Sequence, residues 1–208
     1  MRDSYKVPLI RADGTKVDGE IYEGISPENL DDFETDWYPL LVALRNEAIK
    51  RTAAGDECHD GADYHWKWRR YVERVGKDLA WKQFALEVGG ETQGLMQLSL
   101  VQRSRIEPGQ HLVYVDRLAI APWNRKSNKE GRRYRPVGPL LMRHAIGTSL
   151  SEGFAGRVGL HSLPGAADFY RDRLRMKPFG PDPEHQSLEY FELSAAQGQN
   201  EIEQSQEN

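Results

Sequence analysis

The stretch RRYRPVGPLL, residues 132–141, marks the passage from a basic loop into a helix. From Val137 onward, apolar residues recur at the three- and four-residue spacing of an amphipathic helix. The first turn of a helix has free N–H groups, and the helix dipole favours negative charge there. Pro136 has no N–H to contribute. The stretch therefore predicts either a phosphate-binding turn with one donor missing or a solvated helix start.

Positive charge is concentrated just before this turn. From Trp123 to Arg135 the chain has six basic residues and one acidic residue, Glu130. The basic residues are Arg125, Lys126, Lys129, Arg132, Arg133 and Arg135. Residues 1–64 carry a net charge of −8 (15 acidic, 7 basic), and residues 65–194 carry +7 (21 basic, 14 acidic). This distribution suits an anionic ligand on the middle of the chain and a cationic one on the N-terminal part, although two solvated surfaces would have the same composition.

The segments on either side of the turn predict a mixed α/β fold. QFALEV (83–88) and LMQLSLV (95–101) alternate apolar and polar residues around Gly89–Gly90, which predicts a β-hairpin. HLVYVDRLAIAP (111–122) and GRVGLHS (156–162) predict strands before and after the helix that follows the turn. A strand–helix–strand order of this kind predicts a parallel crossover.

The N-terminal part predicts a hairpin and two helices. Asp13–Gly14 separates two short runs with apolar residues, and Ser26–Pro27 has the pattern of a helix cap followed by proline at the first helical position. Pro39 lies inside the apolar stripe that follows, which predicts a kink or two successive helices. A second helix is predicted over residues 60–75, ended by Gly76.

The C-terminal part predicts a helix, a strand and a tail. GAADFYRDRL (165–174) has a helical pattern, and SLEYFEL (187–193) predicts a closing strand. Residues 195–208 contain one branched aliphatic residue, Ile202, and three glutamates with no basic residue. So polar a segment can bury little apolar surface, and we expect it to be disordered.

Composition places the chain among cytoplasmic globular proteins. Its 208 residues, 38% hydrophobic and 29% charged, are enough for one substantial core. No stretch approaches the roughly 20 apolar residues of a membrane helix, and the N-terminus MRDSYKVPLIRADG does not have the pattern of a signal peptide. Cys58 is the only cysteine, so no internal disulfide can form. We therefore expect a cytoplasmic protein without a membrane partner.

Two motifs resemble the GNAT acetyltransferase superfamily. VDRLAIAPWNR followed by RRYRPVGPLLMRHA is similar to the family's fourth strand and its Arg/Gln-x-x-Gly-x-Gly/Ala turn, which here reads Arg133-x-x-Pro136-x-Gly138. VGLHSLPGAADFYRDRLRMKPFG is similar to the family's next strand and its Ala-x-x-x-Tyr helix, which here reads Ala166-x-x-x-Tyr170. Taken together and in this order, the motifs are fairly specific. The resemblance covers about residues 80–193.

This sequence departs from the family pattern at two glycines. Pro136 replaces the first glycine of the turn, and Arg175 replaces the glycine that usually follows the tyrosine helix. The loop between strand and turn is also longer than the common form. The resemblance implies a mostly antiparallel sheet with splayed, parallel fourth and fifth strands and flanking helices. It also implies one domain over residues 1–194, with an N-terminal hairpin and helices over 1–79 and an acetyl-CoA-binding core over 80–194.

The resemblance implies acetyl-CoA as the acyl donor. In the family, backbone N–H groups of the turn hold the pyrophosphate. Carried onto this chain, that role falls to Arg133, Tyr134, Arg135, Val137 and Gly138. The pantetheine arm enters the gap between the splayed strands, here beside Leu118, Ala119 and Ile120 and the strand that ends at Ser162. An N–H that polarises the thioester oxygen there would act as an oxyanion donor.

The transfer reaction needs a proton donor and a proton acceptor. Family tyrosines at the position of Tyr170 commonly protonate the leaving thiolate, although a core tyrosine would fit the same place. Asp116 shares a strand face with Tyr114 by two-residue alternation and is the candidate for holding or deprotonating the amine, directly or through water. A carboxylate paired with a neighbouring arginine is the alternative for Asp116. Glu87, on the polar face of its strand, is a rival.

The proposed acceptor is an amine of a small molecule or peptide, attacking directly in a ternary complex. A non-catalytic acyl-CoA-binding module and a nucleic-acid-binding protein are the alternatives, and neither nucleic acid nor a metal is expected as a partner. The segment CHDGADYH contains Cys58, His59, Asp60, Asp63 and His65, but their spacing matches no metal-site pattern. The aromatic run YHWKWRRY (64–71) could stack on nucleic-acid bases, but packing into the core is the commoner role of such residues. A homodimer is left open.

Overall fold

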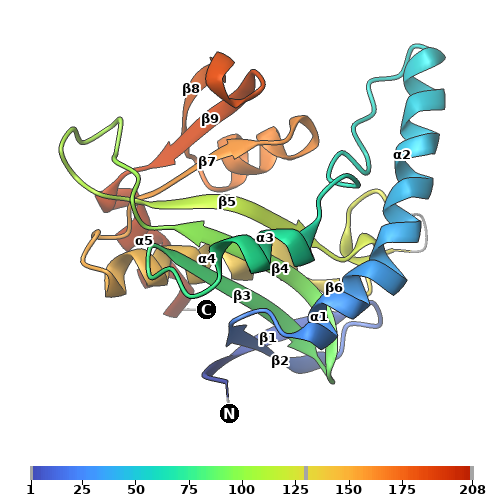
Figure 1. Cartoon of the computed structure of the whole chain (residues 1–208), viewed down its shortest axis with the longest axis horizontal. Coiled ribbons are helices and arrows are strands. Elements are labelled where there is room, and N and C mark those ends of the chain that lie inside the picture. The colour runs from blue at the N-terminus through green and yellow to red at the C-terminus, as the bar shows by residue number, and fades with distance from the viewer. Residues whose placement is uncertain (1, 129–130, 207–208) are drawn as a thin grey trace. The chain divides into compact units, whose positions relative to one another are not determined.

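Strands pair in the order β6-β1-β2-β3-β4-β5-β7-β9-β8 in the computed structural model, which describes residues 2–128 and 131–206 (Figure 1). Their bounds are β1 Ser4–Arg11, β2 Lys16–Glu23, β3 Trp81–Val88, β4 Glu91–Ser99, β5 Val113–Ile120, β6 Tyr134–Arg135, β7 Val158–Ser162, β8 Lys177–Asp182 and β9 Leu188–Leu193. β5 and β7 pair in parallel, whereas β1 with β2, β1 with β6, β2 with β3, β7 with β9 and β8 with β9 are antiparallel. The predicted mixed α/β fold with a mostly antiparallel sheet is confirmed.

The helices lie between groups of these strands along the chain and after the last of them. They are α1 Pro27–Asp32, α2 Tyr38–Ala53, α3 Trp68–Val75, α4 Val137–Ser151 and α5 Ala195–Gln206, together with the π-helical turns η1 Phe33–Trp37 and η4 Phe169–Arg173. Among the described helices, none is long and apolar enough to cross a bilayer. The contacts divide the chain into a first unit of residues 1–96 and 118–141 and a second of residues 97–117 and 142–208. The single domain expected over residues 1–194 stays a prediction.

The first unit begins with the predicted hairpin and helix start. β1 and β2 pair with Tyr5 opposite Ile21, around the turn at Gly14 (φ +89°). Ser26 caps α1 through a capping box with Asn29, whose side chain accepts from the Ser26 N–H at 2.9 Å. The interruption predicted around Pro39 is found as the π-helical turn η1 immediately before α2.

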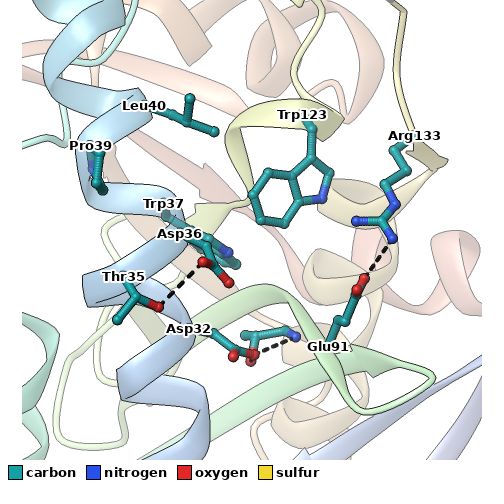
Figure 2. Close-up of a pocket in the computed structure, with 10 residues that line it drawn as sticks. Asp32, Thr35, Asp36, Trp37, Pro39, Leu40, Glu91, Trp123 and Arg133 are labelled. Carbon is teal, nitrogen blue, oxygen red and sulfur yellow. Dashed lines mark hydrogen bonds and ion pairs between the residues drawn. The ribbon is translucent and has the colours of Figure 1, made fainter.

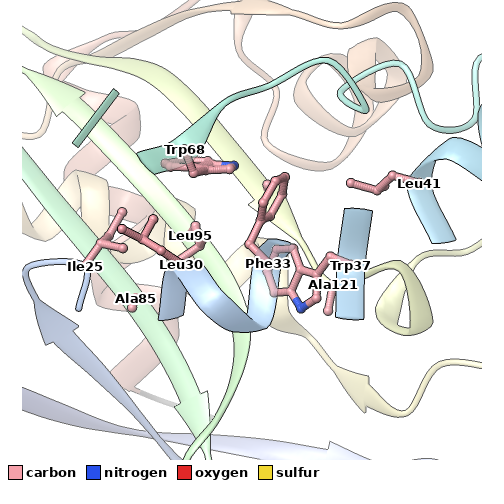
Figure 3. Close-up of a cluster of buried hydrophobic side chains, with 10 residues drawn as sticks. Ile25, Leu30, Phe33, Trp37, Leu41, Trp68, Ala85, Leu95 and Ala121 are labelled. Carbon is pink, nitrogen blue, oxygen red and sulfur yellow. The ribbon is translucent and has the colours of Figure 1, made fainter. Parts of the chain in front are cut away.

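Aromatic side chains of η1 and α3 pack with Leu30 of α1 in the core of the first unit (Figure 3). Trp37 and Trp68 are 0% and 1% exposed. The ring of Phe33 lies 5.6 Å from that of Trp37 and 6.4 Å from that of Trp68, in tilted and edge-to-face arrangements that suit aromatic packing. Trp66 packs against the same cluster, so the two tryptophans of the aromatic run 64–71 belong to the core, whereas Tyr64 is exposed.

A buried carboxylate organises the second unit. Glu192 on β9 is 0% exposed. It accepts hydrogen bonds from the Ser104 hydroxyl, from the N–H groups of Arg105 at 2.8 Å and Ile106 at 3.1 Å, and from the Tyr190 hydroxyl at 3.0 Å. Because these donors come from two separate segments, the carboxylate fastens residues 104–106 to β9.

Three sequence-based expectations need correction. The helix predicted over residues 60–75 begins only at Trp68, because turns occupy the residues before it; it ends at Gly76 as predicted. The segment 165–174 forms a short 3-10 turn and η4 instead of a regular α-helix. Residues 195–206, expected to be disordered, form α5, in which Gly198 lies against Gly156. The close approach of these two glycines supplies packing that a polar sequence does not reveal.

Gly198 provides a test of the docking of α5. A Cβ at this position would lie 2.2 Å from the Gly156 carbonyl oxygen, so Gly198→Ala should lower the free energy of unfolding by about 1–3 kcal/mol. Gly147 in α4 is the matched control, since a Cβ there would meet nothing within 4 Å. Gly147→Ala should raise the stability by about 0.5–1 kcal/mol. Urea denaturation measures both, and equal effects of the two substitutions would contradict the close packing of α5.

Glu192 provides a second stability test. Glu192→Ala leaves buried donors without an acceptor and should destabilise the protein by roughly 3 kcal/mol or more. Glu192→Gln keeps one acceptor oxygen and should cost less. Thermal and urea denaturation compare the two variants. An alanine variant as stable as the wild type would contradict the role of the carboxylate.

Candidate functional site

The parallel pairing of β5 and β7 stops well before β5 ends. The register joins Val113 to Val158, Tyr114 to Gly159 and Val115 to Leu160. β5 nevertheless continues to Ile120, and β7 continues through His161 to Ser162. The last residues of β5 therefore extend beyond the part of the strand that is hydrogen-bonded to β7. A strand whose edge leaves its neighbour exposes backbone N–H and C=O groups that another chain or a ligand can use.

The end of β5 is held by a buried ion pair in the first unit. Ala119 is buried, and Leu118 and Ile120 are half-buried. The Ile120 carbonyl accepts from Arg125 Nη2 at 3.1 Å and Nε at 3.2 Å. Asp63 in turn binds the Arg125 guanidinium through both carboxylate oxygens, at 2.8 and 2.6 Å. The pair fixes the backbone at Ile120 and occupies one of the carbonyls that the sequence assigned to the pantetheine arm.

The turn before α4 has fewer free donors than the sequence indicated. The N–H of Arg133 donates to the Trp123 carbonyl at 3.0 Å, and the N–H of Tyr134 donates to the Asn124 side chain at 2.8 Å. Arg135 pairs with Ile10 in the short strand β6. These residues are therefore engaged in holding the loop to the rest of the first unit.

The first turn of α4 keeps two of the predicted donors. The helix begins at Val137, and the Leu140 N–H donates to the Pro136 carbonyl at 3.2 Å. Residues at the first helical positions have no intrahelical acceptor for their N–H groups, which leaves those of Val137 and Gly138. Pro139 has no N–H. The helix start can thus present two adjacent N–H donors, reinforced by the helix dipole, to an anion.

The side chains of the turn differ in their availability. The Arg133 guanidinium is paired with Glu91 at 2.8 Å. Arg135 is exposed and has no ion pair within residues 2–128 and 131–206. Of the two, Arg135 is the side chain that can add positive charge beside the start of α4.

A pocket with a volume of about 470 Å³ lies in the first unit (Figure 2). Its lining residues are Asp32, Thr35, Asp36, Trp37, Pro39, Leu40, Glu91, Thr92, Trp123 and Arg133. Three carboxylates face one guanidinium, and that guanidinium is already paired with Glu91. Asp32 accepts from the Thr92 N–H at 2.9 Å and from its hydroxyl at 2.6 Å. The remaining negative charge and the Trp123 ring suit an organic cation better than a phosphate.

Asp116 is the first residue of β5 beyond the last pair with β7. Its carboxylate accepts from the Gln97 side chain at 3.0 Å and forms an ion pair with Arg117. The structure thus contains the arginine pairing that the sequence left as the alternative. A carboxylate held by a guanidinium is a weak proton acceptor, because the positive charge favours its ionised form.

Glu87, the rival base, is engaged elsewhere. It accepts from Arg2 at 2.8 Å and from the Asn29 side chain at 2.8 Å. It therefore joins Arg2, which precedes β1, and α1 to strand β3.

Tyr170 lies on η4 and is buried. Its ring packs 5.1 Å from Phe169 and 6.0 Å from Phe191. Burial raises the pKa of the Tyr170 phenol to about 12, so the hydroxyl is protonated at neutral pH. Within the described part of the chain the Tyr170 hydroxyl has no hydrogen-bond partner, so it is available to donate.

Ser162, the last residue of β7, is also buried, and its hydroxyl donates to the Leu163 carbonyl at 2.8 Å.

Sequence reasoning missed a polar cluster in the second unit. The Tyr114 hydroxyl lies 2.8 Å from His161 Nδ1, and His161 Nε2 lies 3.2 Å from Asp182 Oδ2. Arg105 donates to the same Asp182 oxygen at 2.7 Å. The alternation that placed Tyr114 and Asp116 on one face of β5 was the available signal. The partner histidine is 47 residues away in the chain, so no local pattern pointed to it.

The cluster contains residue types that can bind metals. His161, Asp182 and His185 have potential ligand atoms within 4.8 Å of one another. However, the two imidazole rings stack at 3.8 Å with an interplanar angle of 11°. Ring nitrogens bind an ion through lone pairs in the ring plane, and these run nearly parallel here instead of converging. Arg105 also places a positive charge next to the shared carboxylate.

The metal-competent residues of the segment 58–65 are engaged with other groups. Asp63 is bound to Arg125, and the Cys58 thiol lies 3.6 Å from Asp60.

Comparison with known proteins identifies the fold. No protein-family model and no curated protein matches the sequence. A bacterial toxin of known structure is 14% identical and covers 98% of this chain and 97% of its own, with a TM-score of 0.52. FeeM, an N-acyl amino acid synthase from uncultured soil microbes, is 12% identical over 88% of this chain and 93% of its own, with a TM-score of 0.51.

A third similar structure is the GNAT domain of PAT from S. lividans, at 13% identity, 90% and 96% coverage and a TM-score of 0.49. At these identities the likeness concerns the fold and not the activity. The chain shares its fold with the bacterial toxin and with FeeM, with a mostly antiparallel sheet in which β5 and β7 pair in parallel.

Proposed function

We propose that this protein is an acyl-CoA-dependent N-acetyltransferase, which transfers an acetyl group from acetyl-CoA to an amine. The observation that carries the proposal is the end of β5–β7 pairing at Val115 and Leu160, while β5 continues to Ile120. The amide groups of a pantetheine arm can hydrogen-bond to a strand edge that has left its neighbour, as an added strand would. The resemblance of the sequence motifs to the GNAT superfamily supports the same use of this strand.

The pyrophosphate is assigned to the start of α4. The N–H groups of Val137 and Gly138 are its proposed donors, and Arg135 supplies charge. The five donors expected from the family resemblance thereby narrow to two, since the N–H groups of Arg133 and Tyr134 already have acceptors and Arg135 pairs with Ile10 in strand β6. Leu118 and Ala119 are the proposed backbone contacts of the pantetheine arm, and a contact to Ser162 stays a prediction.

The proposed chemistry is direct attack of the amine on the thioester. A nitrogen–carbon bond forms, the carbon–sulfur bond breaks, and the amine loses a proton while the thiolate gains one. Tyr170 is the proposed proton donor, because its phenol is neutral at pH 7 and its hydroxyl is not committed to another group. Asp116 is proposed to hold a positively charged acceptor, since Arg117 already stabilises its ionised form.

The acceptor is proposed to be cationic before it reacts. The three carboxylates of the pocket in the first unit and the net charge of −8 over residues 1–64 support a ligand of this class. A small amine and a lysine-bearing peptide fit this charge equally well.

A non-catalytic acyl-CoA-binding module is the second candidate. It is favoured by the shortage of donors at the start of α4, where Pro136 and Pro139 both lack an N–H. Thiol release from acetyl-CoA in the presence of a panel of amines distinguishes the two, because a binding module takes up acetyl-CoA without releasing thiol.

Tyr170→Phe tests the proton donor. Removal of the hydroxyl should lower kcat by roughly 10²–10⁴-fold and leave the Kd for acetyl-CoA nearly unchanged. Since the pKa of Tyr170 is raised to about 12, the wild-type rate should show no loss from this group below pH 10 or so. Thiol-release kinetics and calorimetry measure the two quantities. A fully active phenylalanine variant would remove Tyr170 from the mechanism.

Gly138→Pro tests the phosphate-binding turn. The substitution deletes one of the two free N–H donors. Because a hydrogen bond to a charged group contributes about 1.5–3 kcal/mol, the Kd for CoA should rise by about 10- to 100-fold. Gly138→Ala is the matched control: it keeps the N–H, and its Cβ would come no closer than 4.0 Å to Ile120. Calorimetric titration with CoA compares them, with circular dichroism to check folding. Equal affinities of the two variants would place the pyrophosphate elsewhere.

A further inference from the structure

A chain of hydrogen bonds starts at the place where β5 and β7 part. Tyr114 belongs to the second of the three β5–β7 pairs, and His161 is the first β7 residue beyond the last pair. The two side chains meet at 2.8 Å, and Asp182 of β8 closes the chain at 3.2 Å from the far nitrogen of His161. The hydrogen bonds therefore connect a β5 residue next to the last β5–β7 pair to a carboxylate of β8 through one hydroxyl and one imidazole.

The protonation state of each member follows from its neighbours. Arg105 holds the pKa of the Asp182 carboxyl far below its usual range, so the carboxylate can only accept hydrogen bonds. Nε2 of His161 must then carry the proton that faces Asp182, which leaves Nδ1 as an acceptor. The Tyr114 hydroxyl, whose pKa is raised to about 12 by burial and by Asp116, donates to Nδ1. Every proton in the resting chain thus points from Tyr114 toward Asp182.

We propose that Tyr114 and His161 form the route by which the attacking amine loses its proton. This inference rests on the proposed acetyl transfer and assigns the groups that accept the proton of the amine. One proton of the ammonium passes to the Tyr114 oxygen while the Tyr114 proton passes to His161 Nδ1, which frees the nitrogen lone pair. The neutral amine then attacks the thioester, and the second proton that its nitrogen loses balances the one that the thiolate gains from Tyr170. The imidazolium is stabilised by the Asp182 carboxylate and returns its proton to solvent after the product leaves. No oxidant or further reactant is required.

Tyr114 is the group that would touch the acceptor, and His161 and Asp182 act through it as positioning residues. A histidine between a hydroxyl and a carboxylate recurs in enzymes that activate a hydroxyl, because the carboxylate fixes the tautomer and stabilises the imidazolium. Asp116 is less suited to this task, since Arg117 and Gln97 already occupy its carboxylate. The hydrogen bonds of Tyr114 and His161, by contrast, are oriented to accept a proton.

The charges around His161 come from every neighbouring element. Arg105 reaches Asp182 from the loop before β5, and its guanidinium lies 4.1 Å above the ring of Tyr190 on β9. His185 follows β8 and stacks on His161. The titratable and charged groups that face the chain are Arg105, Asp116, Arg117, Asp182, His185, Tyr190 and Glu192.

The pKa of His161 is lowered from 6.5, mainly by burial and further by His185 and Arg105, although Asp182 opposes the shift. The imidazole is therefore neutral at pH 7 and able to accept a proton. Because the neutral form is the active one, kcat/KM should be constant near pH 7 and should fall as the pH drops through a value below 6.5.

Two substitutions and two nucleophiles test the route. Thiol release from acetyl-CoA is measured from pH 5 to 9 with spermidine, which arrives protonated, and with hydroxylamine, which is largely unprotonated at neutral pH. Tyr114→Phe and His161→Gln should each lower kcat/KM for spermidine at pH 7 by about 100-fold or more, with a smaller loss for hydroxylamine. The acidic limb of the profile should disappear in His161→Gln.

His185→Gln is the control, because this side chain is 46% exposed and its Nδ1 lies 3.5 Å from Asp182, outside the two hydrogen bonds that join Tyr114, His161 and Asp182. It should keep the wild-type rate at pH 8. It should also move the acidic limb to higher pH, since the His185 imidazole, which stacks on His161, lowers the pKa of His161. Thermal denaturation identifies any variant that has unfolded. Tyr114→Phe, which keeps the ring, remains the decisive variant if His161→Gln does not fold.

The outcomes separate this inference from the proposed function. A folded Tyr114→Phe variant with full activity toward spermidine overturns the route while leaving the acetyl transfer intact. A folded His161→Gln variant whose pH profile keeps its acidic limb also overturns the route and leaves the acetyl transfer intact. A wild-type protein that binds acetyl-CoA but releases no thiol with either nucleophile overturns both.

Discussion

The short parallel contact between β5 and β7 is the constraint on which the rest of the site depends. Three residue pairs hold the strands together, and the contact ends at Val115 and Leu160. Parallel strands require a crossover, which α4 supplies, and the first turn of α4 presents N–H donors after the loop and strand β6 that follow β5. The same ending makes Asp116 and His161 the first residues of β5 and β7 beyond the last residue pair between the two strands. One local event in the sheet thus creates the free strand edge and positions the polar groups beside it.

Much of the fold could be predicted from local sequence patterns. Gly89–Gly90, Ser26–Pro27 and the strand–helix–strand order around α4 each correspond to a structure fixed by neighbouring residues. The failures involve contacts between distant segments. α5 was missed because its stability depends on Gly198 approaching Gly156, which composition does not reveal. β6 was missed because two residues become a strand only by pairing with Ile10 and Arg11 at the far end of the chain.

For the candidate site, the sequence predicted where the residues lie but not which of their groups are free. Alternation along β5 correctly placed Tyr114 and Asp116 on one face, and the turn before α4 was located from its basic loop. Which groups are free to act could not be predicted, because that depends on tertiary partners: Arg117 pairs with Asp116, and Asn124 takes the Tyr134 N–H. His161 was missed for the same reason. Strand pairing brings it next to Tyr114, and its contact with Asp182 determines which ring nitrogen carries the proton.

The account as a whole rests on acyl-CoA binding to the free end of β5 and to the start of α4. Backbone amide hydrogen exchange, followed by mass spectrometry with and without acetyl-CoA, tests this claim most directly. The account predicts slower exchange on binding within residues 116–120 and at residues 137–138, since these N–H groups would gain acceptors from the ligand. Exchange that is unchanged in both segments at saturating acetyl-CoA would contradict it.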